Sequence, residues 1–411
     1  MKKMKHVKLI IISLVSMFLL INISISIRNH YINKRIEEVN QVEFQFENDD
    51  FKNYLIELSK SEDLNFFNEY IQRNFEEPIT TGDVKNIEYL TLGISSGEGN
   101  IEEESIQELI KLAKKIKTIE QIQAFENLSN LKIFDVPIKS IEPLKSLDKL
   151  SYLEINGTHI KDISPIQNSE IYYIVLNNTK IQDLSILNNM EKLKFITLME
   201  NNDIKEVVLS KNNVENIFIQ NTPPQNYSLD LQLYDMPELK SLTVFNNLNN
   251  LKLRKLPELN KLEISGRKGG YLYIQEEDFE GIDSLEQITI KGENKIKTID
   301  FLLELPNINH IRIWKSEIET LFIHQENESI KVLDLSSGIL TNVTGIHNLI
   351  NLTALDLSNN KLEDISMFFD EHDYLLLPNL EYLNLKNNKI PEEQINKYEP
   401  ILRNQVGRLM L

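Results

Sequence analysis

The best candidate for metal ligation in the sequence is the run Asp370, Glu371, His372 and Asp373, whose side chains are all of types that bind cations. Adjacent residues rarely converge on one ion, so a solvated acidic loop is the favoured interpretation. The seven His residues are scattered. The motifs HExxH, GxSxG and GxxxxGK[ST] are absent, and the glycine-rich stretch 266–270 lacks the spacing of the last of them. The sequence therefore predicts no catalytic residues, no metal site and no cofactor.

Composition narrows the class of protein further. The 411 residues include no Cys, which excludes thiolate catalysis, cysteine-based zinc or iron–sulfur sites and disulfides. The formal net charge is −18, which argues against nucleic acid as a partner. With 41% hydrophobic and 26% charged residues, the chain is expected to fold and bury a core.

The N-terminal stretch 9–27 is uncharged and rich in apolar residues, including Leu9, Leu14, Phe18, Leu20 and Ile27. As a helix it would measure roughly 28 Å, close to the hydrocarbon thickness of a bilayer. Basic residues precede it, which predicts that the rest of the chain is exported. Residues 1–28 are expected to be a signal peptide or an N-terminal membrane anchor. Retention is favoured because Ser24–Ser26 is the only small-x-small cleavage site.

The next segments predict a linker followed by a helical cap. Residues 29–47 are expected to be a linker or stalk, and residues 48–86 a helical N-terminal cap. Within the cap, apolar residues at helical spacing mark a first helix, with Phe51, Tyr54, Leu55 and Leu58 on one face. A second helix is expected after Ser61, and a short turn after Thr81.

From residue 87 to 390 the chain repeats. Apolar residues occupy relative positions 1, 4 and 6 of each repeat, and the early repeats begin 21 or 22 residues apart, as in Leu128, Leu131, Ile133; Leu150, Leu153, Ile155; Ile171, Ile174, Leu176; and Leu193, Ile196, Leu198. Position 9 is Asn or Thr in several repeats, including Asn201 and Asn360. This is the LxxLxLxxN pattern of a leucine-rich repeat.

The spacing predicts an α/β solenoid. Positions 4 and 6 alternate with polar residues, so each repeat contributes a short strand with one buried face, and stacked repeats form a parallel sheet on the concave side of a horseshoe. An Asn at position 9 is expected to hydrogen-bond buried loop backbone. The pattern is irregular at about 207–300, where Leu231, Leu233 and Leu251, Leu253 predict an additional strand on the convex side. Residues 391–411 are expected to be a C-terminal cap helix, and 367–377 an insertion.

Three short segments carry more than the generic repeat. IKDISPI (160–166), IQDLSIL (181–187) and LEDI (362–365) resemble the repeat of internalins and related surface proteins of Gram-positive bacteria. In that family a helical cap precedes the repeats, and residues 79–90 resemble its junction with them. The resemblance covers roughly 78–200 and 330–390. The sortase-type sorting motif that wall proteins of the family often have is absent, so any anchor is expected at the N-terminal segment.

The strand positions that face outward define the candidate binding surface. Position 3 holds Tyr152, Tyr173 and Phe195 in consecutive repeats, so their rings are expected to stack at the strand spacing of ~4.8 Å. Positions 5 and 7 hold further aromatic residues, namely Phe134, Phe218, Phe245 and Trp314. Aromatic patches on a rigid sheet are typical of binding surfaces, although such ladders also stabilise sheets.

These observations predict an exported, non-catalytic leucine-rich repeat protein of the cell surface that binds a protein partner through its concave face. It would be tethered by the N-terminal segment or else secreted. The alternatives are a structural envelope protein without a specific ligand, and a glycan-binding module using the aromatic ladder.

Overall fold

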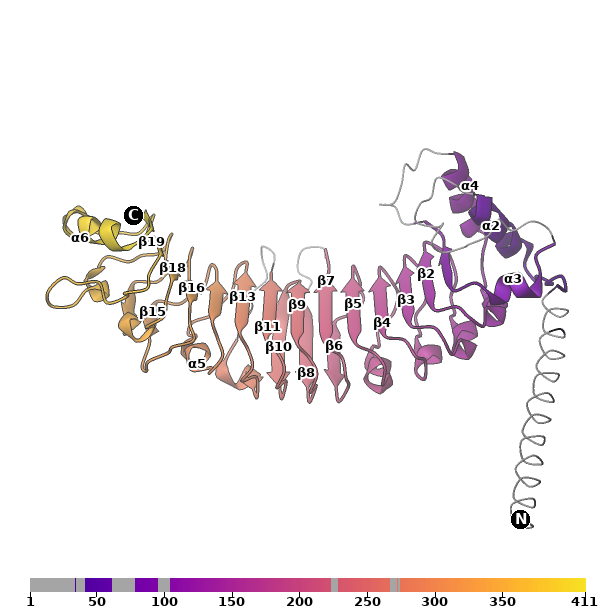
Figure 1. Ribbon diagram of the computed structural model, residues 1–411, viewed down its shortest axis with the longest axis horizontal. Helices are drawn as coiled ribbons and strands as arrows, with labels where there is room; N and C mark the ends of the chain where they lie inside the picture. Colours follow the sequence, from indigo (N-terminus) through magenta and orange to yellow (C-terminus); the bar gives the residue numbers. More distant parts are fainter. Residues whose placement is uncertain are drawn as a thin grey trace, which may run out of the picture.

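The computed structural model describes residues 34, 41–60, 78–94, 104–222, 228–266, 272 and 274–411. Its central feature is a parallel 14-stranded sheet that runs the length of the molecule (Figure 1), which confirms the predicted solenoid. The strands, in their order across the sheet, are β1 (Tyr89–Leu92), β2 (Asn130–Phe134), β3 (Tyr152–Asn156), β4 (Tyr173–Asn177), β5 (Phe195–Met199), β7 (Asn216–Gln220), β9 (Ser241–Phe245), β11 (Lys261–Ser265), β13 (Gln287–Lys291), β14 (His310–Ile313), β16 (Val332–Asp334), β18 (Ala354–Asp356), β19 (Tyr382–Asn384) and β20 (Arg408–Met410).

The register of this sheet follows the repeat. Leu153 of β3 pairs with Ile174 of β4, and Ile174 pairs with Ile196 of β5, so position 4 of each repeat lies beside position 4 of the next. These side chains are buried, while the residues between them face outward. A one-residue slip would place every buried side chain on the solvent face, so the apolar pattern fixes the register.

The outer side of the coils is built in two ways. In the N-terminal repeats it consists of short 3₁₀ helices, namely η1 (Glu120–Ala124), η2 (Glu142–Ser146), η3 (Ser164–Ile166) and η4 (Ser185–Asn189). In the central repeats it is a second parallel sheet, formed by β6 (Glu206–Ser210), β8 (Leu229–Tyr234), β10 (Leu248–Arg254) and β12 (Phe279–Glu280). The prediction of an additional convex strand is therefore confirmed, and Figure 1 shows β6, β8 and β10 on the opposite side of the stack from β7, β9 and β11.

Beyond the second sheet the outer side becomes irregular again. It contains η5 (Glu276–Asp278), α5 (Asp300–Leu303), the paired strands β15 (Thr320–Phe322) and β17 (Asn342–Thr344), and the turns η6 (Ile346–Asn348) and η7 (Ser366–Phe368).

Asparagine at position 9 bonds loop backbone as predicted. The Asn360 amide nitrogen donates to the carbonyls of Leu335 (2.8 Å) and Leu357 (3.0 Å), and its oxygen accepts from the Leu340 amide (3.0 Å). A second asparagine row, one residue before position 1, was not predicted. Its side chains donate to carbonyls of the preceding coil at 2.8–3.0 Å, as in Asn127, Asn307, Asn351 and Asn379. Both rows tie each coil to its neighbour.

The Asp-x-Ser element of the resemblance segments also has a structural role. The carboxylate of Asp183 accepts from the backbone amide of Ser185 at 2.8 Å, and Asp162 and Asp364 make the same contact to Ser164 and Ser366. Each carboxylate therefore begins a 3₁₀ turn.

We expect Asp183→Asn to reduce the acid sensitivity of the fold. The hydrogen bond from the Ser185 amide lowers the pKa of the Asp183 carboxyl. A lowered folded pKa means that stability is present above the unfolded pKa of about 4 and is lost as pH falls through the folded value. Urea unfolding at pH 7 and pH 3 should show a smaller difference for Asp183→Asn than for wild type. An equal difference would contradict this role.

The N-terminal end of the sheet is closed by a cap of helices. It contains α2 (Asp49–Lys60), α3 (Thr81–Lys85) and α4 (Glu104–Ala113), and α4 lies between β1 and β2 in the chain. Tyr54 of α2 is completely buried. Its hydroxyl donates to the Thr91 carbonyl (3.0 Å) and accepts from the Gly93 amide (2.9 Å), so it bonds backbone of the edge strand β1. The second helix expected after Ser61 falls within 61–77, outside the described residues.

The expectation of a linker over 29–47 needs correction for its last residues. Glu43 forms an antiparallel bridge with Thr80, and the Phe44 amide donates to the Ile79 carbonyl at 2.8 Å. The rings of Phe44 and Phe46 lie 4.8 Å apart and pack against the core. Burial of these two rings binds the segment to the cap.

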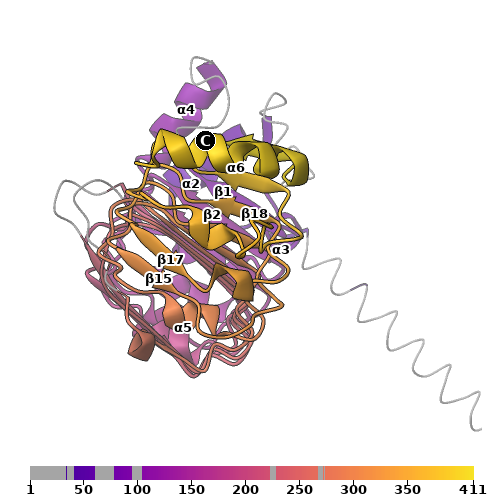
Figure 2. The same ribbon diagram turned by 90° about the vertical axis from the view of Figure 1, so that its left-hand side faces the viewer.

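The C-terminal end is closed by α6 (Glu392–Gln405), followed by β20, which adds an unpredicted last strand. Figure 2 looks along the stack and shows α6 lying across its near end. The insertion 367–377 packs against this helix. Phe369 stacks on Tyr398 with ring centroids 4.0 Å apart, and Lys397 pairs with Asp373 at 2.7 Å.

Across the ranges that the structure describes, no helix has the length and apolar character needed to cross a bilayer. The predicted signal or anchor segment, including Leu9, Leu14, Phe18, Leu20 and Ile27, lies outside those ranges.

Candidate functional site

The outward face of β3, β4 and β5 brings together the three predicted ring positions. The centroids of Tyr152 and Tyr173 are 5.3 Å apart, and those of Tyr173 and Phe195 are 5.4 Å apart. Tyr172, which the sequence analysis missed, packs on Phe195 at 5.2 Å and is 48% exposed. In the sequence, the feature that could have identified Tyr172 is its place as an aromatic residue directly before position 3. We call these four residues the aromatic cluster.

Hydrogen bonds hold two of these rings against the sheet. The Tyr152 hydroxyl donates to the Glu154 carboxylate at 2.8 Å, and the Tyr173 hydroxyl lies 3.1 Å from the hydroxyl of Thr197 on the next strand. Both partners occupy position 5, two residues along the sheet. The rings therefore lean over the sheet, and their hydroxyls are engaged within it.

The aromatic surface continues onto β7 and β9. The rings of Phe218 and Phe245 are 5.6 Å apart and nearly perpendicular, an edge-to-face pair. Across β3, β4, β5, β7 and β9, Glu154 is the only charged side chain among the outward-facing residues at positions 3, 5 and 7. We call this surface the neutral half of the sheet.

The outward face of β11, β13, β14 and β16 differs in chemistry, and we call it the charged half. Its outward positions include Lys261, Glu263, Lys291, Arg312 and Asp334. One network crosses it, because Lys291 pairs with Glu263 at 2.9 Å and its ammonium lies 5.5 Å from the centre of the Trp314 ring.

Trp314 belongs to this charged half and not to the aromatic cluster. Its indole nitrogen donates to the Asp334 carboxylate at 2.7 Å, while Lys291 covers its ring. Both the polar edge and one face of the indole are therefore engaged within the sheet.

Phe134, expected to face outward, is only 3% exposed. This burial, at the end of β2, makes the ring unavailable to a partner. The aromatic surface begins at Tyr152.

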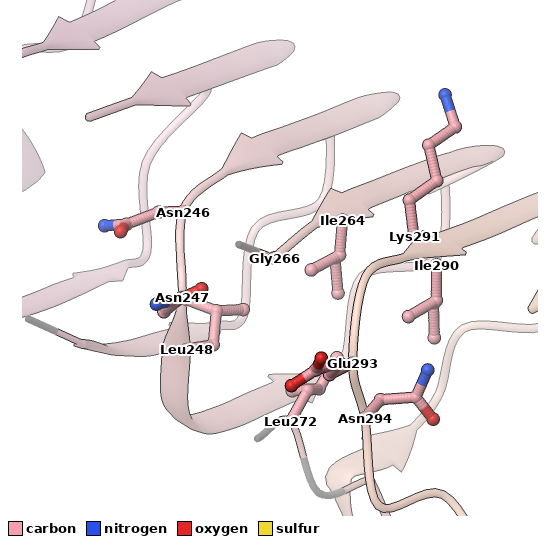
Figure 3. A pocket seen from close by; sticks show the side chains of 10 residues that line it. All are labelled: Asn246, Asn247, Leu248, Ile264, Gly266, Leu272, Ile290, Lys291, Glu293 and Asn294. Carbon is pink, nitrogen blue, oxygen red and sulfur yellow. The ribbon is translucent and has the colours of Figure 1, made fainter. Parts of the chain in front are cut away.

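A cavity of about 10 Å³ lies where β9, β11 and β13 end, which is room for about one water molecule. Figure 3 shows Ile264 and Ile290 projecting to the same side from neighbouring strands, with Glu293 beside Leu272. The cavity is too small for a cofactor. The open sheet surface is the candidate for binding because it carries the aromatic cluster.

The run from Asp370 to Asp373 forms a loop in which the first carboxylate bonds backbone. The Asp370 carboxylate accepts from the backbone amides of His372 (2.9 Å) and Tyr374 (2.8 Å), which closes the loop on itself. Those hydrogen bonds lower the pKa of Asp370, that from Tyr374 being the larger cause. Among the described residues, no group of three or more His, Cys, Asp or Glu side chains is placed to hold a metal.

Comparison with solved structures bears on the fold. An internalin (inlF) from Listeria monocytogenes aligns over 88% of this chain and 95% of its own, with 19% identity and a TM-score of 0.51. The chain has the leucine-rich repeat fold. The leucine-rich repeat protein LIC12759 of Leptospira interrogans aligns over 80% of this chain and 97% of its own, with 14% identity and a TM-score of 0.38.

Comparison of sequences gives a narrower match. No family model matches the chain. Leucine-rich repeat-containing protein 23 of Bos taurus is 30% identical over 174 residues, which span 40% of this chain and 48% of the bovine protein. The chain thus covers about half the length of that curated relative.

Proposed function

We propose that this leucine-rich repeat protein is an exported, non-catalytic protein of the cell surface that binds a protein partner through the neutral half of its long sheet. One observation carries the proposal. The neutral half combines the aromatic cluster with Phe218, Phe245 and Met199 and holds a single charged residue. Enrichment in aromatic residues and methionine with depletion of charge is the composition of an interface core.

Rigidity supports the same proposal. The rings stand on a hydrogen-bonded sheet and contact one another, so few rotors remain to be ordered when a partner binds. The Tyr152 and Tyr173 hydroxyls are engaged within the sheet, which favours apolar contact over recognition of sugar hydroxyls. Export rests on the apolar segment 9–27 and the basic residues before it, which would tether or release the repeats outside the membrane.

The test replaces Tyr152, Tyr173 and Phe195 together by serine in the whole chain. Several hot-spot residues each contribute about 2 kcal/mol or more to binding, so we expect affinity for a captured partner to fall by roughly 100-fold or more. Binding is measured by pulldown from extracts of cell-envelope and host-surface proteins, followed by titration of the captured protein.

A matched variant with Val208, Phe322 and Tyr374 changed to serine alters the same number of exposed apolar side chains away from the long sheet. It should retain the partner's apolar contact with the neutral half. Thermal unfolding is recorded for both variants. Unchanged binding together with a large loss of thermal stability in the aromatic variant would show that the rings serve the sheet alone, as in a structural envelope protein.

A further inference from the structure

We infer that the charged half recognises a carboxylate of the protein partner, through the Arg312 guanidinium assisted by His310 and Lys331. The inference rests on the proposed function, because it assigns chemistry to the same partner. It predicts a partner segment that is apolar where it meets the neutral half and acidic where it meets β14.

The register of the sheet brings these three residues together. His310 and Arg312 are two residues apart on β14, so both face outward. His310 pairs with Val332 of β16, and Lys331 directly precedes Val332. The imidazole Nδ1 of His310 is in hydrogen-bond contact with the side-chain oxygen of Asn309. Partial burial lowers the pKa of His310, and the positive charges of Arg312 and Lys331 lower it further.

Three carboxylates on nearby strands have partners within the sheet: Asp334 and Asp356 are held by neutral donors, and Glu263 is in an ion pair. Asp334 is the register partner of Arg312, yet its carboxylate accepts from the Trp314 indole (2.7 Å) and from the Ser336 amide (3.0 Å). Glu263 is paired with Lys291 at 2.9 Å. One strand further on, Asp356 accepts from Tyr382 (3.1 Å) and Asn384 (2.8 Å).

The side chains of Arg312 and Lys331 form no ion pair with any residue that the structure describes. The chain as a whole carries a net charge of −18, so these two cations lie on a predominantly acidic molecule. Arg312 is half-buried, and a guanidinium offers two parallel N–H donors that match a carboxylate. A long polyanion would meet more of the surrounding negative charge than one acidic side chain would.

The geometry also sets a spacing in the partner. Three strand intervals separate β9, which carries Phe245, from β14, a distance of about 14 Å. An extended segment covers that distance in roughly four residues. The partner is therefore expected to place Asp or Glu about four residues from an aromatic or aliphatic side chain.

The experiment uses a phage-displayed library of random 16-residue peptides, selected on the immobilised whole chain. We expect the enriched peptides to share an acidic residue at that spacing from an apolar one. The strongest peptide is synthesised and titrated against wild type and Arg312→Gln/Lys331→Gln. Affinity should fall about tenfold or more in the variant. Replacing the acidic residue of the peptide with its amide should lower its affinity for wild type by a similar factor. The same replacement should change its affinity for the variant little.

A matched control, Lys361→Gln/Lys386→Gln, removes the same charge from exposed sites on the C-terminal repeats and should bind like wild type. Equal affinity for the Arg312→Gln/Lys331→Gln variant, or a selection that enriches no acidic peptide, would overturn the inference. The variant with Tyr152, Tyr173 and Phe195 changed to serine separates the two proposals. If it alone loses binding, the proposed function stands and the carboxylate site fails. If it keeps full affinity, the proposed function itself fails.

Discussion

Replacing Tyr54 with phenylalanine is expected to lower the free energy of unfolding by about 2–3 kcal/mol, because it leaves buried backbone groups without a hydrogen-bond partner. The Tyr54 hydroxyl bonds the Thr91 carbonyl and the Gly93 amide of the first coil, at the edge of the 14-stranded sheet. Phenylalanine keeps the ring packing and removes only the hydroxyl. Urea unfolding followed by circular dichroism measures the difference.

The matched control is Tyr374→Phe, since Tyr374 is 66% exposed, and we expect a change within about 0.5 kcal/mol. pH provides a second readout. Burial raises the pKa of Tyr54, so its neutral form is favoured in the folded state. Stability from this group is therefore present below the unfolded pKa of about 10 and is lost as pH rises above it. The difference between wild type and Tyr54→Phe should narrow above pH 10, and a constant difference would contradict the assignment.

Asn360→Ala is the second substitution with a large expected effect, a loss of about 3 kcal/mol in unfolding free energy. The side chain is buried and bonds the carbonyls of Leu335 and Leu357 and the amide of Leu340. Alanine leaves all three groups unpaired in the turn between two coils. Denaturant unfolding gives the global effect, and hydrogen exchange at the Leu340 amide gives the local one.

The control for this variant is Asn342→Ala, because Asn342 is exposed and its side chain makes one long contact, 3.4 Å, to Thr344. Its unfolding free energy should stay within about 0.5 kcal/mol of wild type. Slow exchange at Leu340 in Asn360→Ala would argue that another acceptor in a relaxed turn replaces the lost hydrogen bond.

Much of the fold could be predicted because apolar residues recur at fixed short intervals within each repeat. The period of 21 or 22 residues determines the register of β2 to β5, and paired leucines such as Leu231 and Leu233 indicate the second sheet. By contrast, α4 and β20 fall outside the repeat pattern. The strand β20 forms by pairing with β19 at the end of the sheet, and this contact is a property of the tertiary structure.

The candidate site could be predicted in part. Alternation placed Tyr152, Tyr173 and Phe195 on one face, and their ring contacts follow from the strand register. The engagement of Trp314 by Asp334 could not be foreseen, because the two residues come from different coils and meet only through stacking. The role of Tyr54 was hidden for the same reason, since a helical apolar pattern does not reveal what a hydroxyl touches.

The second sheet over β6, β8, β10 and β12 has a mechanical consequence. A solenoid bends when neighbouring coils are spaced more widely on the convex side than on the concave side. Where strands line both sides, neighbouring strands are ~4.8 Å apart on each side, so the difference in spacing that causes bending is absent. Equal spacing on both sides favours a nearly straight central stretch, and Figure 1 shows both ends of the stack rising from it. A partner that contacts Phe218 and Phe245 would therefore meet a flat surface. At Tyr152, nearer the N-terminal cap, the same partner would meet a curved one.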